Sequence, residues 1–255
     1  MNNHQNSAAG YAGRTDRLQG KVALITGASR GLGQAIALAY AREGANLVLN
    51  SRAASEGELE RVRIEAEAAG AQVLSVSADI SERNDVERLA ATALAHFGRV
   101  DILINNASAL GPSPMPLLAD TAPDDFLAVL RTNVLAPFLL TRSLIGQMLA
   151  RDSGLVINVS SDAAVAAYPH WGAYGSSKAA LEQLTRIWAA ELEGTGVGLV
   201  TVDPGSMNTL MHRLAEPDED PGQWADPEAV APILVALATG DPARLNGRSF
   251  ETQEA

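Results

Sequence analysis

Short apolar runs alternate with longer amphipathic stretches from residue 21 onward. The runs are rich in Val, Ile and Leu, and they cover residues 22–26, 47–50, 73–76, 100–105, 155–160 and 197–202. They show little alternation with polar residues, which is typical of strands buried on both faces in a parallel sheet covered by helices. We therefore predict that the runs are strands of one sheet.

The stretches between the runs have the period of helices. Leu32, Ile36 and Tyr40 recur at four-residue steps, and Gly44 follows where that helix can end. The same pattern ends at a glycine in three more places: 59–66 before Gly70, 86–93 before Gly98 and 179–192 before Gly194. Alternating strands and helices predict right-handed βαβ units. The expected fold is α/β, a doubly wound parallel sheet of about seven strands with helices on both faces (a Rossmann fold).

The pattern contains no repeat and no long linker, so we predict a single domain over residues 17–255. Residues 1–16 are polar, and we expect them to be a disordered tail. Residues 111–116 and 216–227 contain Pro and are predicted to be loops. The second loop is acidic and is either a mobile lid or a plain solvated loop.

Composition narrows the function classes. The chain has 255 residues, 47% hydrophobic and 19% charged, which is typical of a globular protein. It has no Cys, which excludes disulfides, Cys-ligated zinc, iron–sulfur clusters and thiol catalysis, and we assign no metal site. Its net charge of −11 argues against nucleic acid and anionic membranes as partners. No uninterrupted apolar run approaches the ~20 residues of a membrane span, and the N-terminus lacks a hydrophobic signal core, so we expect a cytoplasmic protein.

A glycine-rich turn follows the first apolar run. The spacing is Gly-x-x-x-Gly-x-Gly from residue 27 to residue 33, and a helical pattern comes next. Glycines let the backbone turn tightly and approach a pyrophosphate at a helix N-terminus. Glycine also serves helix–strand packing, but a strand before the turn and a helix after it favour a dinucleotide site. The residues of this loop assigned to the cofactor are Gly27, Ser29, Arg30, Gly31, Leu32 and Gly33.

The second apolar run indicates which dinucleotide binds. Sites for NAD usually have an acidic residue at the end of the second strand, for the ribose 2′-hydroxyl. Here Ser51 and Arg52 stand at that place, and Arg30 lies in the glycine loop. Two guanidinium groups suit a 2′-phosphate, so we predict NADP(H) over NAD(H). The alternative is that both are ordinary surface arginines.

A Tyr and a Lys at the start of the long helix suggest proton transfer. Tyr174 and Lys178 are four residues apart and share a helical face. A nearby ammonium should lower the phenol pKa from its usual ~10. Ser161 comes at the end of a strand, where it can hold a substrate carbonyl while the phenol transfers a proton.

Together these motifs resemble those of the short-chain dehydrogenase/reductase family, in its simple single-domain branch. The resemblance runs from Gly20 to about Gly247. It rests on the glycine loop 26–33, Asp79-Ile80, Asn105-Asn106-Ala107, Asn133, Ser161, Tyr174, Lys178, and Asp203-Pro204-Gly205 followed by Thr209.

The resemblance implies a role for each matching residue. Tyr174 would be the acid in reduction and the base in oxidation, and Lys178 would lower its pKa and hold the ribose hydroxyls. Ser161 would polarise the substrate oxygen, and Asn133 would support a proton-relay water. Cofactor contacts are implied for Asp79 and Ile80 at the adenine, Asn106 and Ala107 behind the fourth strand, and Pro204, Gly205, Met207 and Thr209 near the nicotinamide.

Three positions depart from the family pattern. Ser108 stands where the family usually has Gly after Asn-Asn-Ala, and it should narrow the pocket. Residues 246–252 replace the usual terminal Asp-Gly-Gly segment, which puts the usual tetramer in doubt. A homo-oligomer is still expected, with a dimer through the helices around 122–150 and 174–193. The segment after Thr209 is short, which suggests a small lid.

The substrate pocket is thinly specified. Family geometry places residues 108–110, 162–164, 168–171 and 207–212 around it. Trp171 is either a pocket wall or a core residue, and His170 either touches substrate or lies in an exposed loop. We assign catalysis to neither His170 nor His212.

The leading hypothesis is an NADP(H)-dependent oxidoreductase that interconverts a ketone or aldehyde and an alcohol. A 3-oxoacyl carrier-protein reductase is the second, but such enzymes often carry basic residues where this chain has Asp152 and Thr195. Docking an acidic carrier on a chain of net charge −11 is unfavourable, although Arg151 weakens that point. The third is a non-catalytic nucleotide-sensing protein on the same fold. Members of that kind commonly lack the Tyr or the Lys.

Overall fold

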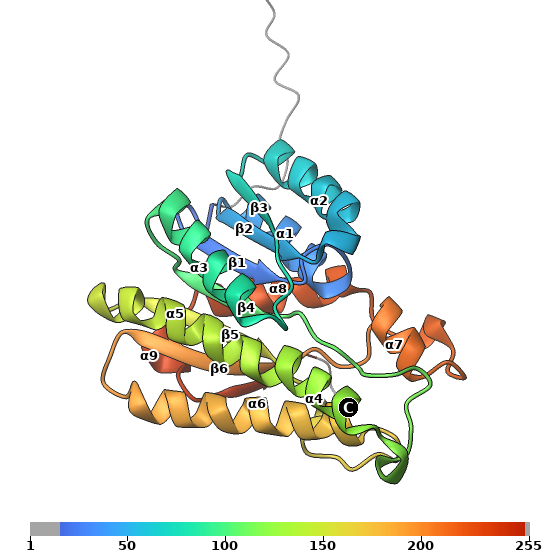
Figure 1. Cartoon of the computed structure of the whole chain (residues 1–255). Coiled ribbons are helices and arrows are strands. Elements are labelled where there is room, and N and C mark those ends of the chain that lie inside the picture. The colour runs from blue at the N-terminus through green and yellow to red at the C-terminus, as the bar shows by residue number, and fades with distance from the viewer. Residues whose placement is uncertain (1–15, 253–255) are drawn as a thin grey trace, which may run out of the picture.

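The computed structural model describes residues 16–252, and in that part of the chain seven parallel strands form one sheet (Figure 1). The strands are β1 (Val22–Thr26), β2 (Asn46–Ser51), β3 (Val73–Ser77), β4 (Ile102–Asn105), β5 (Gly154–Val159), β6 (Val197–Asp203) and β7 (Ser249–Glu251). Their order is β3-β2-β1-β4-β5-β6-β7. The doubly wound fold is therefore confirmed, and the six predicted strands agree to within two residues at each end.

Helices cover both faces of the sheet. One layer contains α1 (Gly31–Arg42), α2 (Glu56–Ala68) and α8 (Pro227–Ala238). The opposite layer contains α3 (Arg83–Phe97), α5 (Ala136–Ala150) and α6 (Gly172–Glu191). Each layer encloses its own apolar cluster against the sheet, because every central strand is buried on both sides.

Shorter helical segments complete the fold. They are α4 (Pro123–Leu130), a π-helical segment (Arg131–Leu135), α7 (Leu210–Ala215), α9 (Pro242–Leu245), and 3₁₀ turns at Ala53–Ser55, Leu118–Asp120, Asp162–Ala164 and Pro221–Gln223. The π-helical segment joins α4 directly to α5. In Figure 1, α7 projects beyond the sheet on the side to which the β1 arrow points.

The helical periodicity identified the buried faces correctly. Leu32, Ile36 and Tyr40 are all buried on α1. Gly98 ends α3 with a left-handed backbone at φ 74°, a conformation that glycine adopts without steric strain. The pattern did not identify β7 or the helices after residue 209, because these elements are short or nearly uniform in hydrophobicity.

The predicted loops are loops, but the second one is anchored. The Trp224 side chain is buried and donates a hydrogen bond from Nε1 to Glu219 at 3.0 Å. Met207 pairs with Ala225 in an isolated bridge. The hydrogen bond holds residues 216–227 together, and the bridge ties them to the segment before α7. Apart from Asp16, the predicted tail lies outside the described residues.

One helix among the described residues, Pro123–Ala150, is long and apolar enough to span a bilayer by length and composition. Half of its most apolar window is buried inside the protein. It forms α4, the π segment and α5, and α5 packs on the sheet beside α3, so its apolar character fits a core helix.

Candidate active site

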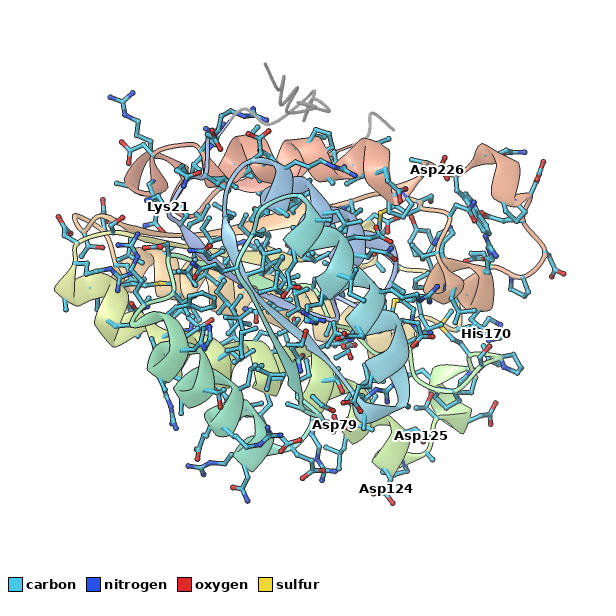
Figure 2. All side chains as sticks on the ribbon, turned by 90° about the horizontal axis from the view of Figure 1, so that it is seen from above. Lys21, Asp79, Asp124, Asp125, His170 and Asp226 are labelled. Atoms are coloured by element: carbon cyan, nitrogen blue, oxygen red, sulfur yellow. The ribbon has the colours of Figure 1, made fainter. Side chains whose placement is uncertain are left out.

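The site lies at the carboxyl ends of the strands. β1 and β4 are neighbours in the sheet, although the chain between them adds β2 and β3 on the other side of β1. Such a topological switch point leaves a crevice outside the carboxyl ends of the two strands. Figure 2 shows Lys21, which precedes β1, at the opposite end of the molecule from His170 and Asp226.

The glycine loop at this edge can accept no larger side chains. Gly27 and Gly31 have positive φ angles of 65° and 55°. A Cβ on Gly33 would overlap the carbonyl oxygen of Gly27, and one on Gly27 would lie 2.9 Å from the Cα of Ala107. Within the described chain, no side chain caps the start of α1, which leaves its first N–H groups for a ligand. This cradle fits a diphosphate.

Asn106 and Ala107 brace this loop from β4. The hydroxyl oxygen of Thr26 accepts hydrogen bonds from the backbone N–H groups of Asn106 and Ala107, at 3.1 and 3.0 Å. The Asn106 side chain donates to the carbonyl of Thr26 at 2.8 Å. Asn106 and Ala107 therefore position the glycine loop, and their own contact with a cofactor stays a prediction.

Arg30 reaches the end of β2. Its Nη2 donates to the hydroxyl of Ser55 at 2.5 Å, next to the exposed Arg52. Ser51 is buried, and its hydroxyl donates to the carbonyls of Arg52 and Ser55 at 3.2 and 3.4 Å. The Arg30 side chain therefore lies against the turn that follows β2, which begins at Arg52, and the Ser51 hydroxyl is held within that turn.

Asp79 and Ile80 follow β3. One carboxyl oxygen of Asp79 accepts from the N–H and the hydroxyl of Ser81, at 2.9 and 2.8 Å, so Asp79 shapes the turn before α3. Ile80 is buried. A role for this pair at an adenine stays a prediction.

Tyr174 and Lys178 are both buried in the first two turns of α6. Lys178 Nζ donates to the carbonyl of Val159 at 2.7 Å and lies 5.4 Å from the centre of the Tyr174 ring. Ser161 lies two residues after Val159, the last residue of β5. Its Oγ accepts a hydrogen bond from the N–H of Ala163 at 3.2 Å. The helix and the strand thus bring the three predicted catalytic residues to one place.

Burial determines the proton affinities of this pair. It raises the pKa of Tyr174 to about 12, against hydrogen bonds with Ser161 and Ser108 that lower it. It lowers the pKa of Lys178 to about 8. The net shift of the Tyr174 pKa is therefore upward, the reverse of the direction expected from the sequence, because loss of solvent is its largest cause. The effect of the Lys178 charge on the phenol stays a prediction.

Asn133 lies in the π-helical segment and is buried. Its Oδ1 accepts from the Ala109 N–H at 2.7 Å and from the Ser108 hydroxyl at 3.1 Å. Its Nδ2 donates to the carbonyl of Ala109 and the hydroxyl of Ser177, both at 2.9 Å. Protein groups thus use the hydrogen-bonding capacity of the side chain. The relay-water role stays a prediction.

The segment after β6 closes the crevice opposite the glycine loop. Asp203 accepts a hydrogen bond from the N–H of Gly205 at 2.9 Å, which shapes the turn at Pro204. Thr209 caps α7, and its methyl carbon lies 3.3 Å from where a Cβ on Gly31 would stand. Thr209 therefore faces the glycine loop directly. Its implied contact with the nicotinamide end stays a prediction.

Aromatic side chains line the substrate side. Trp171 is half-buried and stands edge-on to Tyr174, with ring centres 5.6 Å apart, so it is a wall of the site. His170 is exposed, and its Nδ1 lies 3.1 Å from the carbonyl oxygen of Met115. His212 of α7 packs edge-on against Trp224, which lies in the loop 216–227.

Two acidic residues at this site were not assigned from the sequence. Asp203 is partly buried, and burial raises its pKa. The charge of Asp162 is close enough to Tyr174 to add to the rise in the Tyr174 pKa. The resemblance included Asp203 in a motif and placed Asp162 near the pocket, but it gave neither carboxylate a role.

Residues 21–220 match the family model described as short chain dehydrogenase. The chain belongs to this family. A short chain dehydrogenase of Pseudocercospora fijiensis is 39% identical over 93% of this chain and 82% of that protein. The 3-oxoacyl-(acyl-carrier-protein) reductase of Thermotoga maritima is 30% identical over 91% of this chain and 96% of its own length.

Solved structures agree with this membership. A short chain dehydrogenase from Shigella flexneri, complexed with NADP, superposes with a TM-score of 0.87 at 30% identity, over 94% of this chain and 99% of that chain. As a short chain dehydrogenase, the protein is an oxidoreductase that acts on CH–OH and C=O groups.

Proposed function

We propose that this short chain dehydrogenase is an NADP(H)-dependent enzyme that interconverts a ketone or aldehyde and an alcohol, with Tyr174 as the proton donor and acceptor. The observation that carries the proposal is the buried placement of Tyr174 and Lys178 on α6 beside Ser161, at the mouth of the glycine-loop crevice.

The described residues fit a nicotinamide dinucleotide. The glycine loop and the start of α1 would hold the diphosphate, and Lys178 with the 204–209 segment would hold the nicotinamide end. When bound, the nicotinamide supplies or accepts the hydride. Arg30 and Arg52 support the choice of NADP(H), because Arg30 reaches Ser55 just after β2 and Arg52 is exposed directly after the same strand, where a ribose 2′-phosphate would lie.

The proton chemistry follows from the burial of Tyr174. With its pKa raised to about 12, the phenol is protonated at neutral pH and can give a proton to the oxygen of a carbonyl that is being reduced. Ser161 holds that oxygen, and Trp171 packs against the phenol from the substrate side. The same phenol must lose its proton before it can act as the base in oxidation, so oxidation should increase with pH.

Tyr174→Phe tests this proposal. NADPH consumption by the parent is measured over ketones, aldehydes, diketones, quinones and sugars, and the variant is then measured on the best substrate. The variant should bind cofactor as the parent does and lose about 10²–10⁴ in rate, because only the phenolic proton is removed. Near-parental turnover would refute the assignment. Cofactor binding without turnover on any carbonyl would favour the nucleotide-sensing alternative.

The acyl-carrier alternative has support from the Thermotoga relative. The counter-evidence is local: Asp152 stands where a basic docking residue would be useful, and it accepts a hydrogen bond from the N–H of Gly196 at 2.6 Å. A small carbonyl substrate is therefore the better proposal.

We also propose a homo-oligomer and a cytoplasmic location. The exposed Leu135, Leu149 and Ile187 support the first, because they lie on the helices expected to pair.

A further inference from the structure

A hydrogen-bonded carboxylate lies directly beside the serine of the site. Ser161 Oγ donates to Asp162 Oδ1 at 2.9 Å, and the N–H of Ala163 donates to the same carboxyl oxygen at 2.8 Å. Tyr168 Oη donates to the other oxygen, Oδ2, at 2.7 Å. Both oxygens of Asp162 are thus engaged, which fixes the plane of the carboxylate.

The turn that carries Asp162 is held against the catalytic helix. A Cβ on Gly175 would lie 2.8 Å from the carbonyl oxygen of Ala163, so the turn touches α6 at the residue after Tyr174. The Tyr168 ring is 6.0 Å from Trp171, which in turn stands against Tyr174. Tyr168 is therefore linked to Ser161 through the carboxylate and to Tyr174 through the indole.

A serine hydroxyl has one proton to donate and two lone pairs that accept. While the proton of Ser161 is shared with Asp162, the serine can only accept a hydrogen bond from a substrate, which suits an alcohol. A carbonyl oxygen needs a donor and must compete with a charged acceptor for that proton. Charge-assisted hydrogen bonds are the stronger ones, so this competition is costly for a carbonyl.

We propose that Asp162, held by Tyr168, is a positioning residue that keeps Ser161 in its accepting orientation and so favours binding of the alcohol over the carbonyl. The inference rests on the proposed function, because it requires Ser161 to hold the substrate oxygen.

The charge of Asp162 also affects the pKa of Tyr174, and this effect can be measured separately from substrate affinity. The charged groups that act on the Tyr174 phenol are Asp203 at the end of β6 and Asp162, which both raise its pKa, while Lys178 lies over its ring. Across the crevice, His212 of α7 is a titratable group on which Asp162 also acts. Removing the Asp162 charge should lower the pKa of Tyr174. The rise of oxidation activity with pH should then occur at lower pH.

The test compares Asp162→Ala, Asp162→Asn and Tyr168→Phe, with Glu191→Gln as the control. Glu191 is an exposed carboxylate on α6, about 25 Å along the helix from Tyr174 at 1.5 Å per residue. Affinities for the best carbonyl and its alcohol are measured by calorimetry on NADP⁺-loaded proteins that also carry Tyr174→Phe, so binding is read without turnover. The pH profile of oxidation is measured with Tyr174 intact.

Asp162→Ala should bind the carbonyl about threefold to tenfold more tightly and the alcohol more weakly. Asp162→Asn keeps an acceptor but loses the charge, so it should move the pH profile to lower pH with a smaller change in the affinity ratio. It also serves if the alanine variant folds poorly. Tyr168→Phe keeps the charge and should leave the pH profile in place.

An unchanged carbonyl-to-alcohol affinity ratio in Asp162→Ala, or the same changes in Glu191→Gln, would overturn the inference and leave the proposed function standing. Full turnover by Tyr174→Phe would instead remove the proposed function and this inference with it.

Discussion

Replacing Arg52 should change which cofactor this short chain dehydrogenase prefers. Arg52 is exposed beside the end of β2, and Arg30 reaches the same place through its hydrogen bond to Ser55 at 2.5 Å. A 2′-phosphate would be held there by charge-assisted contacts. Such contacts contribute about 1.5–3 kcal/mol each, and the exposed position of Arg52 favours the lower end of that range.

Arg52→Ala should therefore weaken NADPH use by about tenfold, and by at most about a hundredfold, while NADH use stays nearly constant. The assay is kcat/KM for each cofactor with the same carbonyl substrate. Arg61→Ala is the matched control, since Arg61 is an exposed arginine two turns into α2. A parent that prefers NADH, or an Arg52→Ala variant with unchanged NADPH use, would refute the phosphate-binding argument.

A carboxylate in place of Ser51 would affect both cofactor preference and stability. Ser51→Asp would supply the carboxylate of NAD-specific relatives, but the Ser51 hydroxyl is buried and donates to two backbone carbonyls. A carboxylate cannot donate and would face those oxygens, so a loss of stability should accompany any gain in NADH use. The double variant Ser51→Asp with Arg52→Ala is measured in two ways. Thermal unfolding gives the loss of stability, and kcat/KM with NADH gives the change in cofactor use.

Three further changes test the rest of the site. Lys178→Met should weaken cofactor binding and turnover and move the oxidation profile to higher pH, because a positive charge beside the phenol is lost; unchanged affinity and profile would contradict both roles. Ser108→Ala removes a hydrogen bond that lowers the pKa of Tyr174, so that pKa should rise and oxidation should need higher pH; a shift to lower pH would contradict this. Gly33→Ala places a Cβ against the Gly27 carbonyl and should lower stability by about 1–3 kcal/mol and weaken cofactor binding, whereas Gly57→Ala, with open space around it, should be neutral or stabilising by thermal unfolding.

The elements of this protein that depend on local pattern could be read from the chain. Continuous apolar runs require burial on both faces, and a single doubly wound sheet provides it for all of them. The glycine loop was identifiable because its neighbours are a strand and a helix, and the structure agrees, since Gly27 and Gly31 adopt positive φ angles. The spacing of Tyr174 and Lys178 put both on one face of α6, whatever surrounds them.

Local pattern was insufficient where distant groups decide the outcome. Asn133 looked like a support for water, but its bonding capacity is used by residues 24 to 44 positions away. Asp162 and Tyr168 were placed near the pocket by the resemblance, but their hydrogen bond was not foreseen, because no periodicity links an acid to a phenol six residues away. The short β7 is visible only through its pairing with β6.

The sequence by itself determined the fold, the position of the glycine loop and the common helical face of Tyr174 and Lys178, because spacing along a helix or strand dictates which side chains share a face. Only the tertiary structure decided how these groups behave. A pKa depends on the solvent and charge around the group, and here burial raises that of Tyr174 to about 12 and lowers that of Lys178 to about 8. Packing against remote segments produces that burial, so no local pattern could contain it.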